Sequence, residues 1–271
     1  MAAPAISELI QVFLDYVDTF DVGDRDLRSK VSLKRTHSQR VCDEIASLAT
    51  ELAFDATVVD LARVAGLLHD VGRFEQYYRF RTFSDLKSVD HGSLGAAIVR
   101  QTGILSGFSK ADQTRILSAI RFHNRPAIPT EAYRDRLMLQ LTQLLRDADK
   151  LDIMRIFTGQ LHPADQANDG SWPCHADTGV SAAVVDCMLR KQIVPVERVR
   201  TRSDLTLMRT SWVFDMNFTP TWKRFLQRGY LKALERRVPQ TSGVVCAFQT
   251  VHEFIQFQLA SHDVDFLVGA G

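Results

Sequence analysis

Cysteine is scarce in this sequence, and the few cysteines are scattered. No two of the four stand in a Cys-x-x-Cys spacing, and we expect no secretory leader with them, which argues against both a zinc knuckle and a disulfide framework. They are Cys42, Cys174, Cys187 and Cys246. Because this usage is typical of a reducing compartment, we expect a cytoplasmic protein.

Long apolar runs and an excess of one charge are also lacking. No apolar stretch approaches the roughly 20 residues that a membrane span requires. The N-terminal segment has no basic region and carries Glu8 and Asp15 among its apolar residues, unlike a signal peptide. Lysine and arginine total 33 against 32 aspartates and glutamates, so no overall field favours polyanions. We therefore expect no membrane partner and no extended nucleic-acid surface.

Signatures of β-strands are nearly absent, whereas apolar residues recur at helical spacing through most of the chain. Between Thr36 and Ala53, for example, Val41, Ile45 and Leu48 fall on one stripe. The pattern predicts an all-α fold, a helical bundle with a C-terminal helical extension. The helices expected in the bundle are Thr36–Ala53, Thr57–His69, Ser109–His123 and Thr130–Met154.

A break in composition separates the two parts. The segment HPADQANDGSWPCH, residues 162–175, is rich in glycine, proline, asparagine and aspartate, which favours a domain boundary there. We therefore predict one domain over residues 1–160 and a helical extension over 161–271. Helical patterns recur in the extension around residues 180–191, 203–214, 222–237 and 244–260. It would serve as a lid or as a dimer surface, so a homodimer is one arrangement we consider.

Polar residues recur in register with the buried stripes of the bundle. His69 and Asp70 close an apolar helix in LLHDVGRF, where burying both side chains without partners would be costly. The same register recurs at His37, four residues before Val41, at His91, His123 and Asp149. Any single one of these histidines would be interpreted as an ordinary core residue. Together, imidazoles and carboxylates on converging helices predict a metal site, since a bound cation removes the penalty for burying them.

These residues, in this order, resemble the HD-domain superfamily, whose name describes the doublet seen here as His69-Asp70. The resemblance covers roughly residues 36–156 and is sharpest in RTHSQRV, LLHDVGRF and LLRDADKLDIM. It implies the six-ligand, dinuclear type of metal-dependent phosphohydrolase. One divalent ion would be bound by His37, His69, Asp70 and Asp149, and a second by Asp70, His91 and His123.

Several details of this site follow from the resemblance. Among Asp147, Asp149 and Asp152, Asp149 matches the family position in the D-x-D-K stretch and also shares the buried stripe with Leu145. Asp70 would bridge the ions, and a bridging hydroxide formed between them would attack phosphorus. Manganese, iron, magnesium, cobalt and nickel are the candidate metals.

Basic residues close in sequence to the ligands are candidates for substrate binding. Arg73 stands where many relatives carry lysine, and its planar guanidinium suits phosphate, although an ion pair with Glu75 or another carboxylate is the alternative. Gly72 is expected to end the preceding helix and turn Arg73 toward the site. We expect the segment Phe74–Asp90 to form a loop that covers the metals. Asp70 and Arg73 are the predicted catalytic residues, and the predicted substrate-binding residues are Arg73, Lys87, Arg125 and Lys150.

Three functions are compatible with the sequence. The first is hydrolysis of a small phosphomonoester or phosphodiester, with nucleotides among the candidates, so the expected partner is a small phosphorylated molecule. The second is oxidative cleavage of a phosphonate or polyol, because a few six-ligand relatives are diiron oxygenases and this ligand set also suits iron. The third is a metal-binding sensor module without turnover. Ligand spacing does not separate the first two.

Overall fold

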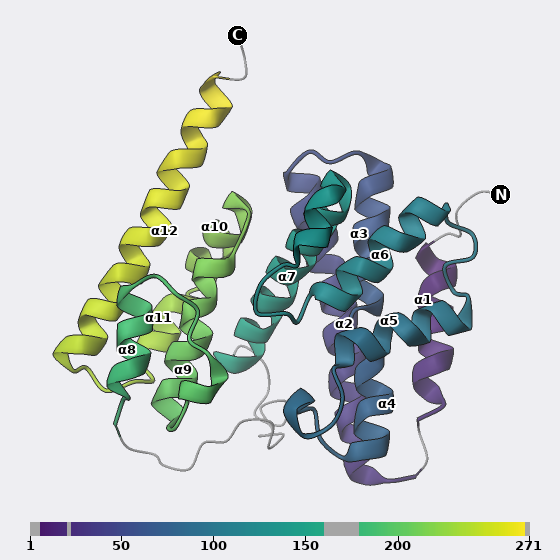
Figure 1. The fold of residues 1–271 in the computed structure, drawn as a ribbon, viewed down its shortest axis with the longest axis horizontal. Helices are drawn as coiled ribbons and strands as arrows, with labels where there is room; N and C mark the ends of the chain where they lie inside the picture. The colour runs from purple at the N-terminus through teal and green to yellow at the C-terminus, as the bar shows by residue number, and fades with distance from the viewer. Residues whose placement is uncertain (1–5, 21–22, 160–178, 269–271) are drawn as a thin grey trace. The chain divides into compact units, whose positions relative to one another are not determined.

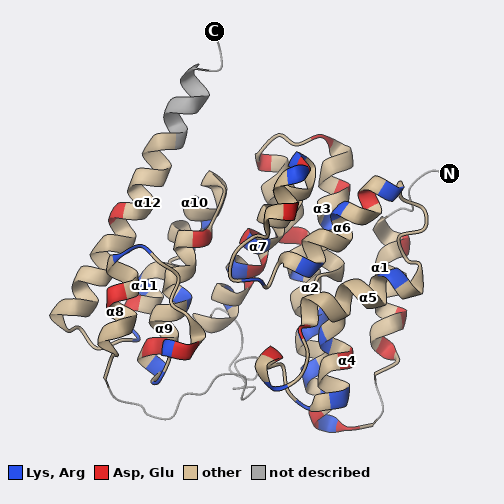
Figure 2. Ribbon diagram, in the orientation of Figure 1, with Lys and Arg blue, Asp and Glu red and all other residues tan. Residues whose placement is uncertain are grey.

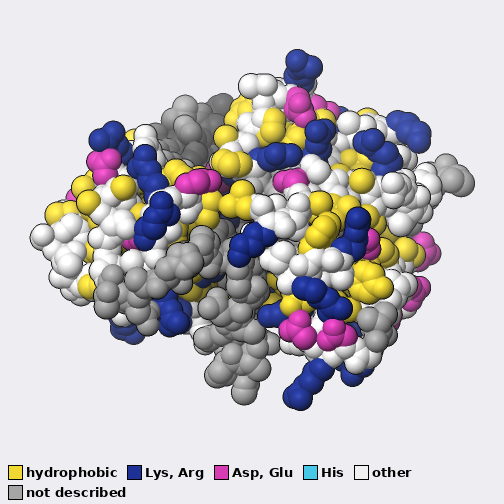
Figure 3. All heavy atoms as spheres, turned by 60° about the horizontal axis from the view of Figure 1, so that its bottom comes forward, with side chains coloured by type: hydrophobic (Ala, Val, Ile, Leu, Met, Phe, Trp, Pro, Cys, Tyr) yellow, Lys and Arg dark blue, Asp and Glu magenta, His cyan; other side chains and the backbone are white. Residues whose placement is uncertain are grey.

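The computed structural model describes residues 6–20, 23–159 and 179–268, and in this part of the chain every regular element is helical (Figure 1). The all-α prediction is confirmed. No helix within the described ranges is both long and apolar enough to cross a membrane. Lys and Arg positions are interspersed with Asp and Glu positions along the helices (Figure 2), and side chains of both signs occur on the face drawn in Figure 3.

The described residues form two compact units, one that ends at Asp152 and one that begins at Ile153. The predicted boundary at residues 162–175 lies outside the described residues, and the predicted division at residue 160 stays a prediction. The first unit contains α1 (Ile6–Asp18), α2 (Arg25–Glu51), α3 (Ala56–Leu68), α4 (Val71–Phe80), η1 (Asp85–Lys87), α5 (His91–Thr102), α6 (Lys110–Phe122), η2 (Thr130–Arg134) and the greater part of α7 (Arg136–Phe157).

Helix α2 is the longest element of the first unit and begins well before the predicted Thr36. Asp24 caps its N-terminus, since its Oδ1 accepts hydrogen bonds from the backbone N–H groups of Asp26 and Leu27 at 3.0 and 3.3 Å. The predicted stripe of Val41, Ile45 and Leu48 is completely buried. Because α2 packs along α3, this stripe forms the centre of the unit's core.

Helix α7 begins later than the sequence predicted. Residues 130–134 form the short 3₁₀ helix η2, and Asp135 has an extended backbone with φ −131°. The Asp135 carboxylate accepts from the N–H groups of Leu137 and Met138 at 2.9 and 3.1 Å, which starts a new helix there. The predicted single helix from Thr130 is therefore wrong in its first turns.

Gly72 does not end a helix, contrary to the prediction. Helix α3 ends at Leu68, and after His69 and Asp70 the chain enters α4 at once. A Cβ atom on Gly72 would lie 2.4 Å from the His91 carbonyl oxygen and 2.7 Å from the Gly95 nitrogen. Glycine is therefore needed because α4 and α5 approach each other closely at this point.

The predicted loop over residues 74–90 is likewise shorter than expected, because residues 74–80 belong to α4. Phe74 is buried against the rings of Phe13 and Phe20, with centroid distances of 5.9 and 6.1 Å. These contacts fix α4 against α1 and the residues that follow it. The connection between α4 and α5 is therefore confined to residues 81–90, which include η1.

The second unit packs short helices against α12 (Ser242–Val268), which contacts both α8 (Ala182–Leu189) and α10 (Thr219–Gln227). Its other elements are η4 (Val196–Arg198), α9 (Arg202–Ser211), η5 (Trp212–Asp215) and α11 (Tyr230–Glu235). The helical pattern around 222–237 is split between α10 and α11 at Gly229, whose φ of +71° ends α10.

Candidate metal centre

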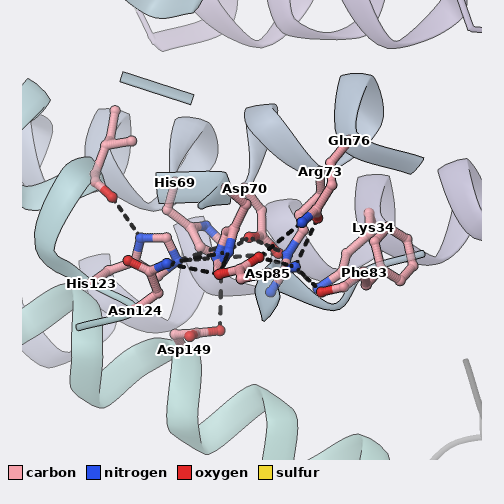
Figure 4. A network of polar contacts seen from close by, with 12 residues as sticks. Lys34, His69, Asp70, Arg73, Gln76, Phe83, Asp85, His123, Asn124 and Asp149 are labelled. Atoms are coloured by element: carbon pink, nitrogen blue, oxygen red, sulfur yellow. Dashed lines mark hydrogen bonds and ion pairs between the residues drawn. The ribbon is translucent and has the colours of Figure 1, made fainter. Parts of the chain in front are cut away.

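The six predicted ligands come from helices or helix ends of the first unit, and the fold brings them together. His37 lies within α2 and Asp149 within α7, while the other four flank or begin helices. His69 and His123 follow the last residues of α3 and α6, Asp70 precedes α4, and His91 begins α5. The side chains labelled in Figure 4 converge on one buried region, and of the six only Asp149 is more than slightly exposed, at 16% of its side chain.

The four imidazoles face one another with their Nε2 atoms. The Nε2 atoms of His37 and His69 are 3.2 Å apart, and those of His91 and His123 are 3.0 Å apart. Two histidine pairs therefore point inward from four different helix positions.

Each Nδ1 atom, in contrast, is held from the outer side of the cluster. His69 and His123 donate from Nδ1 to the carbonyl oxygens of Gly66 and Ile120 at 2.8 and 2.6 Å. The Nδ1 atoms of His37 and His91 face the carboxylates of Asp152 and Asp85 at 2.7 and 2.6 Å. Since a carbonyl oxygen can only accept, the neutral rings of His69 and His123 carry their proton on Nδ1 and present an Nε2 lone pair to the interior.

This orientation is the one that metal-ligating histidines adopt. Burial, together with the neighbouring His91 and His69, lowers the pKa of His123 to about 3, so its inward nitrogen is unprotonated at neutral pH. Burial and the charge of Arg73 also lower the pKa of His91. Two inward lone pairs 3.0 Å apart repel each other unless a cation lies beside them. The described residues of the first unit therefore fit a metal site.

Asp70 lies between the two histidine pairs. Its Oδ2 is 3.5 Å from His37 Nε2 and 3.6 Å from His69 Nε2. Its Oδ1 is 3.4 Å from His91 Nε2 and 3.9 Å from His123 Nε2. The carboxylate thus offers one oxygen to each pair.

Of Asp147, Asp149 and Asp152, the three candidates for the last ligand, Asp149 is the one whose carboxylate faces histidine Nε2 atoms. Its Oδ1 is 3.1 Å from His37 Nε2 and 3.7 Å from His69 Nε2. Asp152 holds the opposite nitrogen of His37, and Asp147 is completely buried elsewhere. The position of Asp149 is compatible with the predicted ligand role, and the role itself stays a prediction.

Three overlapping groups in the described residues have ligand atoms within 4.8 Å of one another: His37, His69 and Asp70; His69, His123 and Asp149; and Asp70, His91 and His123. All six predicted ligands occur in at least one group. These groups could hold one or more ions, and the grouping does not fix their number.

Charges around the cluster keep its carboxylates ionised. Burial raises the pKa of Asp70, but the charges of Lys34, His69, Arg73 and His91 outweigh burial and lower it well below its usual range. Burial and the Lys34 charge oppose protonation of His37, yet hydrogen bonds to Asp149 and Asp152 raise its pKa to about 9. In the absence of a metal, a proton on His37 therefore supplies positive charge to this half of the cluster.

Two further carboxylates, those of Asp85 and Asp152, hold histidines in place. Asp152 accepts two hydrogen bonds from the Arg40 guanidinium, at 2.6 and 2.9 Å, in addition to its contact with His37. Asp85 contacts His91, Arg73 Nη1 at 3.1 Å, Gln76 Nε2 at 2.8 Å and Asn124 Nδ2 at 3.1 Å. In the sequence, Asp152 is a competitor of Asp149 for the ligand position, and no pattern marks Asp85.

The predicted substrate-binding residues have different surroundings. Arg73 is largely buried, and its Nη1 contacts Gln76, the Phe83 carbonyl oxygen and Asp85, so the ion-pair alternative occurs with Asp85 in place of Glu75. Arg125 is half-buried, 3.6 Å from Asp90 and 3.3 Å from Ser93 Oγ. Lys150 is buried next to Asp149, whereas Lys87 is exposed on η1. Substrate binding by these four residues stays a prediction.

The first unit is thus a helical domain that buries a cluster of four histidines and two aspartates. Residues 35–154, a range that includes all six, match the family model of the HD domain. Members of this family are commonly metal-dependent hydrolases. No curated protein and no solved structure was found that matches the chain.

Proposed function

We propose that the protein is a phosphohydrolase that binds two divalent metal ions and cleaves a small phosphomonoester or phosphodiester. The observation that carries the proposal is the position of Asp70, which offers one oxygen to the His37–His69 pair and the other to the His91–His123 pair. A carboxylate shared in this way is suited to hold two ions close together.

In this proposal the chain supplies six ligands and the groups that orient them. His37, His69, Asp70 and Asp149 would hold one ion, and Asp70, His91 and His123 the other. When bound, such ions act as Lewis acids toward a phosphoryl group and lower the pKa of a water molecule toward neutrality. Asp85 and Asp152 keep the rings of His91 and His37 in the orientation that presents Nε2.

Lys34 and Arg73 flank Asp70 and counter the negative charge of the cluster. Lys34 Nζ is 2.8 Å from Oδ2 and Arg73 Nε is 3.5 Å from Oδ1. Because both cations favour the ionised carboxylate, Asp70 is ready to accept metal ions at neutral pH. Arg73 is the predicted residue for contact with a phosphoryl oxygen.

The test is turnover of a panel of phosphoesters by protein loaded with manganese, cobalt or iron. Phosphate release is expected from the wild type and from Asp186→Asn, a control on α8 whose carboxylate pairs with Arg190 on the surface. Asp70→Asn should lose activity by more than about 100-fold, since it weakens both metal positions. Failure of protein with two bound ions to cleave any ester would contradict the proposal.

The predicted ligand set supports the oxygenase alternative, because four imidazole nitrogens and two carboxylates suit iron as well as manganese. Protein isolated anaerobically would then contain iron and consume oxygen with a phosphonate or polyol. A redox-inactive native metal would exclude this alternative. A sensor module would bind metal without turning over either class of substrate.

A further inference from the structure

We propose that Lys34 binds an anionic oxygen of the substrate beside the His37–His69 pair; this inference rests on the proposed function. Lys34 lies on α2, one turn before His37. Its Nζ contacts Asp70 Oδ2, the same oxygen that faces the Nε2 atoms of His37 and His69. No sequence motif points to this residue.

Lys34 is placed where the cluster meets solvent. Its side chain is 18% exposed, whereas that of Asp70 is 3% exposed. In Figure 4 it approaches Asp70 from the side of Phe83. The ammonium group therefore reaches a fully buried ligand while it stays accessible to a small molecule.

Lys34 also retains hydrogen-bonding capacity. An ammonium group has three N–H donors, and within the described residues its hydrogen bond to Asp70 is its one polar contact. The Phe83 ring, with its centroid 5.4 Å from Nζ, is the other neighbour that holds the group in place. The remaining N–H donors of the Lys34 ammonium group can therefore bind an anionic oxygen.

Arg73, the cation predicted for this role, is more fully engaged. Its guanidinium lies 5.7 Å from the same Phe83 ring, and its Nη1 contacts Gln76, Phe83 and Asp85. These contacts tie α4 to residues 81–90. Through Nη1, Arg73 therefore supports this segment, whereas Lys34 contacts the Asp70 oxygen that faces the His37–His69 pair.

The chemistry of a phosphoryl group matches this position. Asp70 and Asp149 bring two negative charges to the His37–His69 half, and a phosphate monoester brings up to two more. A compact ammonium charge beside them reduces the repulsion and can follow the oxygen on a flexible stem. Lys34 would thus select substrates that carry an anionic oxygen near the scissile bond.

Binding of inorganic phosphate to the manganese-loaded protein tests the inference without turnover. Isothermal titration would compare the wild type with Lys34→Met, which keeps the apolar stem, and with Lys34→Arg, which keeps the charge. Lys110→Met is the matched control, because Lys110 begins α6 and His123 follows its other end, about 20 Å away. Metal content is measured for each variant.

We expect Lys34→Met to bind a normal complement of manganese but to bind phosphate at least about 10-fold more weakly, with Lys34→Arg between it and the wild type. On any phosphoester that the wild type cleaves, KM should rise more than kcat falls. Lys110→Met should match the wild type in every measurement. If Lys34→Met does not fold by circular dichroism, Lys34→Gln replaces it.

Three results would overturn the inference. Unchanged phosphate affinity in Lys34→Met, or no phosphate binding by the wild type, would show that Lys34 does not bind the anion. Parallel loss of manganese and phosphate would assign Lys34 to supporting Asp70 alone. Phosphate binding that depends on Lys34 without hydrolysis of any ester would keep the inference and reject the hydrolase proposal, so the two failures are distinguishable.

Discussion

The Nε2 atoms of His91 and His123 lie 3.0 Å apart, while the Nδ1 atom of each ring is held by a separate partner on the outer side. The two rings cannot turn away from each other without breaking those outer hydrogen bonds. The fold thus maintains a repulsive contact that a cation would relieve.

The first prediction concerns metal removal. Chelation should lower the unfolding temperature, because ions that bind only the folded state stabilise it by about 2.7 kcal/mol at a concentration 100 times the Kd. Thermal unfolding of chelator-treated protein, before and after addition of manganese, measures the difference. His123→Ala should respond less than the wild type. Equal melting temperatures with and without metal would count against a metal site.

The second prediction separates the two halves of the cluster. Asp85→Ala should weaken the His91 half and Asp152→Ala the His37 half, each by about 10- to 100-fold in metal affinity. Each variant is therefore the control for the other. On a His91→Ala background, Asp85→Ala should add little further loss, while Asp152→Ala should add its full effect. Equal additional losses in metal titrations would show that the two carboxylates do not act on separate halves.

The third prediction concerns the contact between α4 and α5. Gly72→Ala should destabilise the fold by about 1–3 kcal/mol, because its Cβ would lie 2.4 Å from the His91 carbonyl oxygen. The displacement should also reduce metal affinity, since His91 begins α5. Gly243→Ala is the matched control in a helix, where the new Cβ would meet Val185 at an ordinary 3.4 Å. Urea unfolding of both variants measures the difference, and similar stabilities would refute the steric argument.

The fourth prediction concerns the buried Cys42. Burial, with the nearby Asp43 charge, raises the pKa of its thiol to about 11. The reactive thiolate is therefore scarce below that pH, and the thiol is 3% exposed. Iodoacetamide at pH 8 should label the exposed Cys246 and spare Cys42 until urea is added, as peptide mapping by mass spectrometry would show. Rapid labelling of Cys42 in the folded protein would be the contrary result.

Much of the bundle could be predicted because its buried stripes repeat at helical spacing. Val41 and Ile45 on α2, for instance, are completely buried, as expected. Helix starts were less predictable, since Asp24 and Asp135 act through side-chain hydrogen bonds, two each, to backbone N–H groups. Aspartate is also common at positions where it caps no helix, so its presence alone does not mark a helix start.

The candidate site was likewise predictable only in part. The convergence of the six predicted ligands could be predicted, because each is in register with an apolar stripe or matches a family motif. The roles of Lys34 and Asp85 were not, since each depends on a partner brought close only by folding. Gly72 was misinterpreted because a glycine after a helix has two uses, to end it or to admit a neighbouring backbone, and sequence alone does not distinguish them.

The shared carboxylate of Asp70 has a thermodynamic consequence. With one oxygen on each histidine pair, an ion bound in either half would fix the carboxylate for the other. Thermodynamic linkage makes this effect mutual. The factor by which one ion changes the affinity of the second equals the factor by which the second changes the affinity of the first. If the centre holds two ions, as proposed, its halves are therefore expected to bind them interdependently.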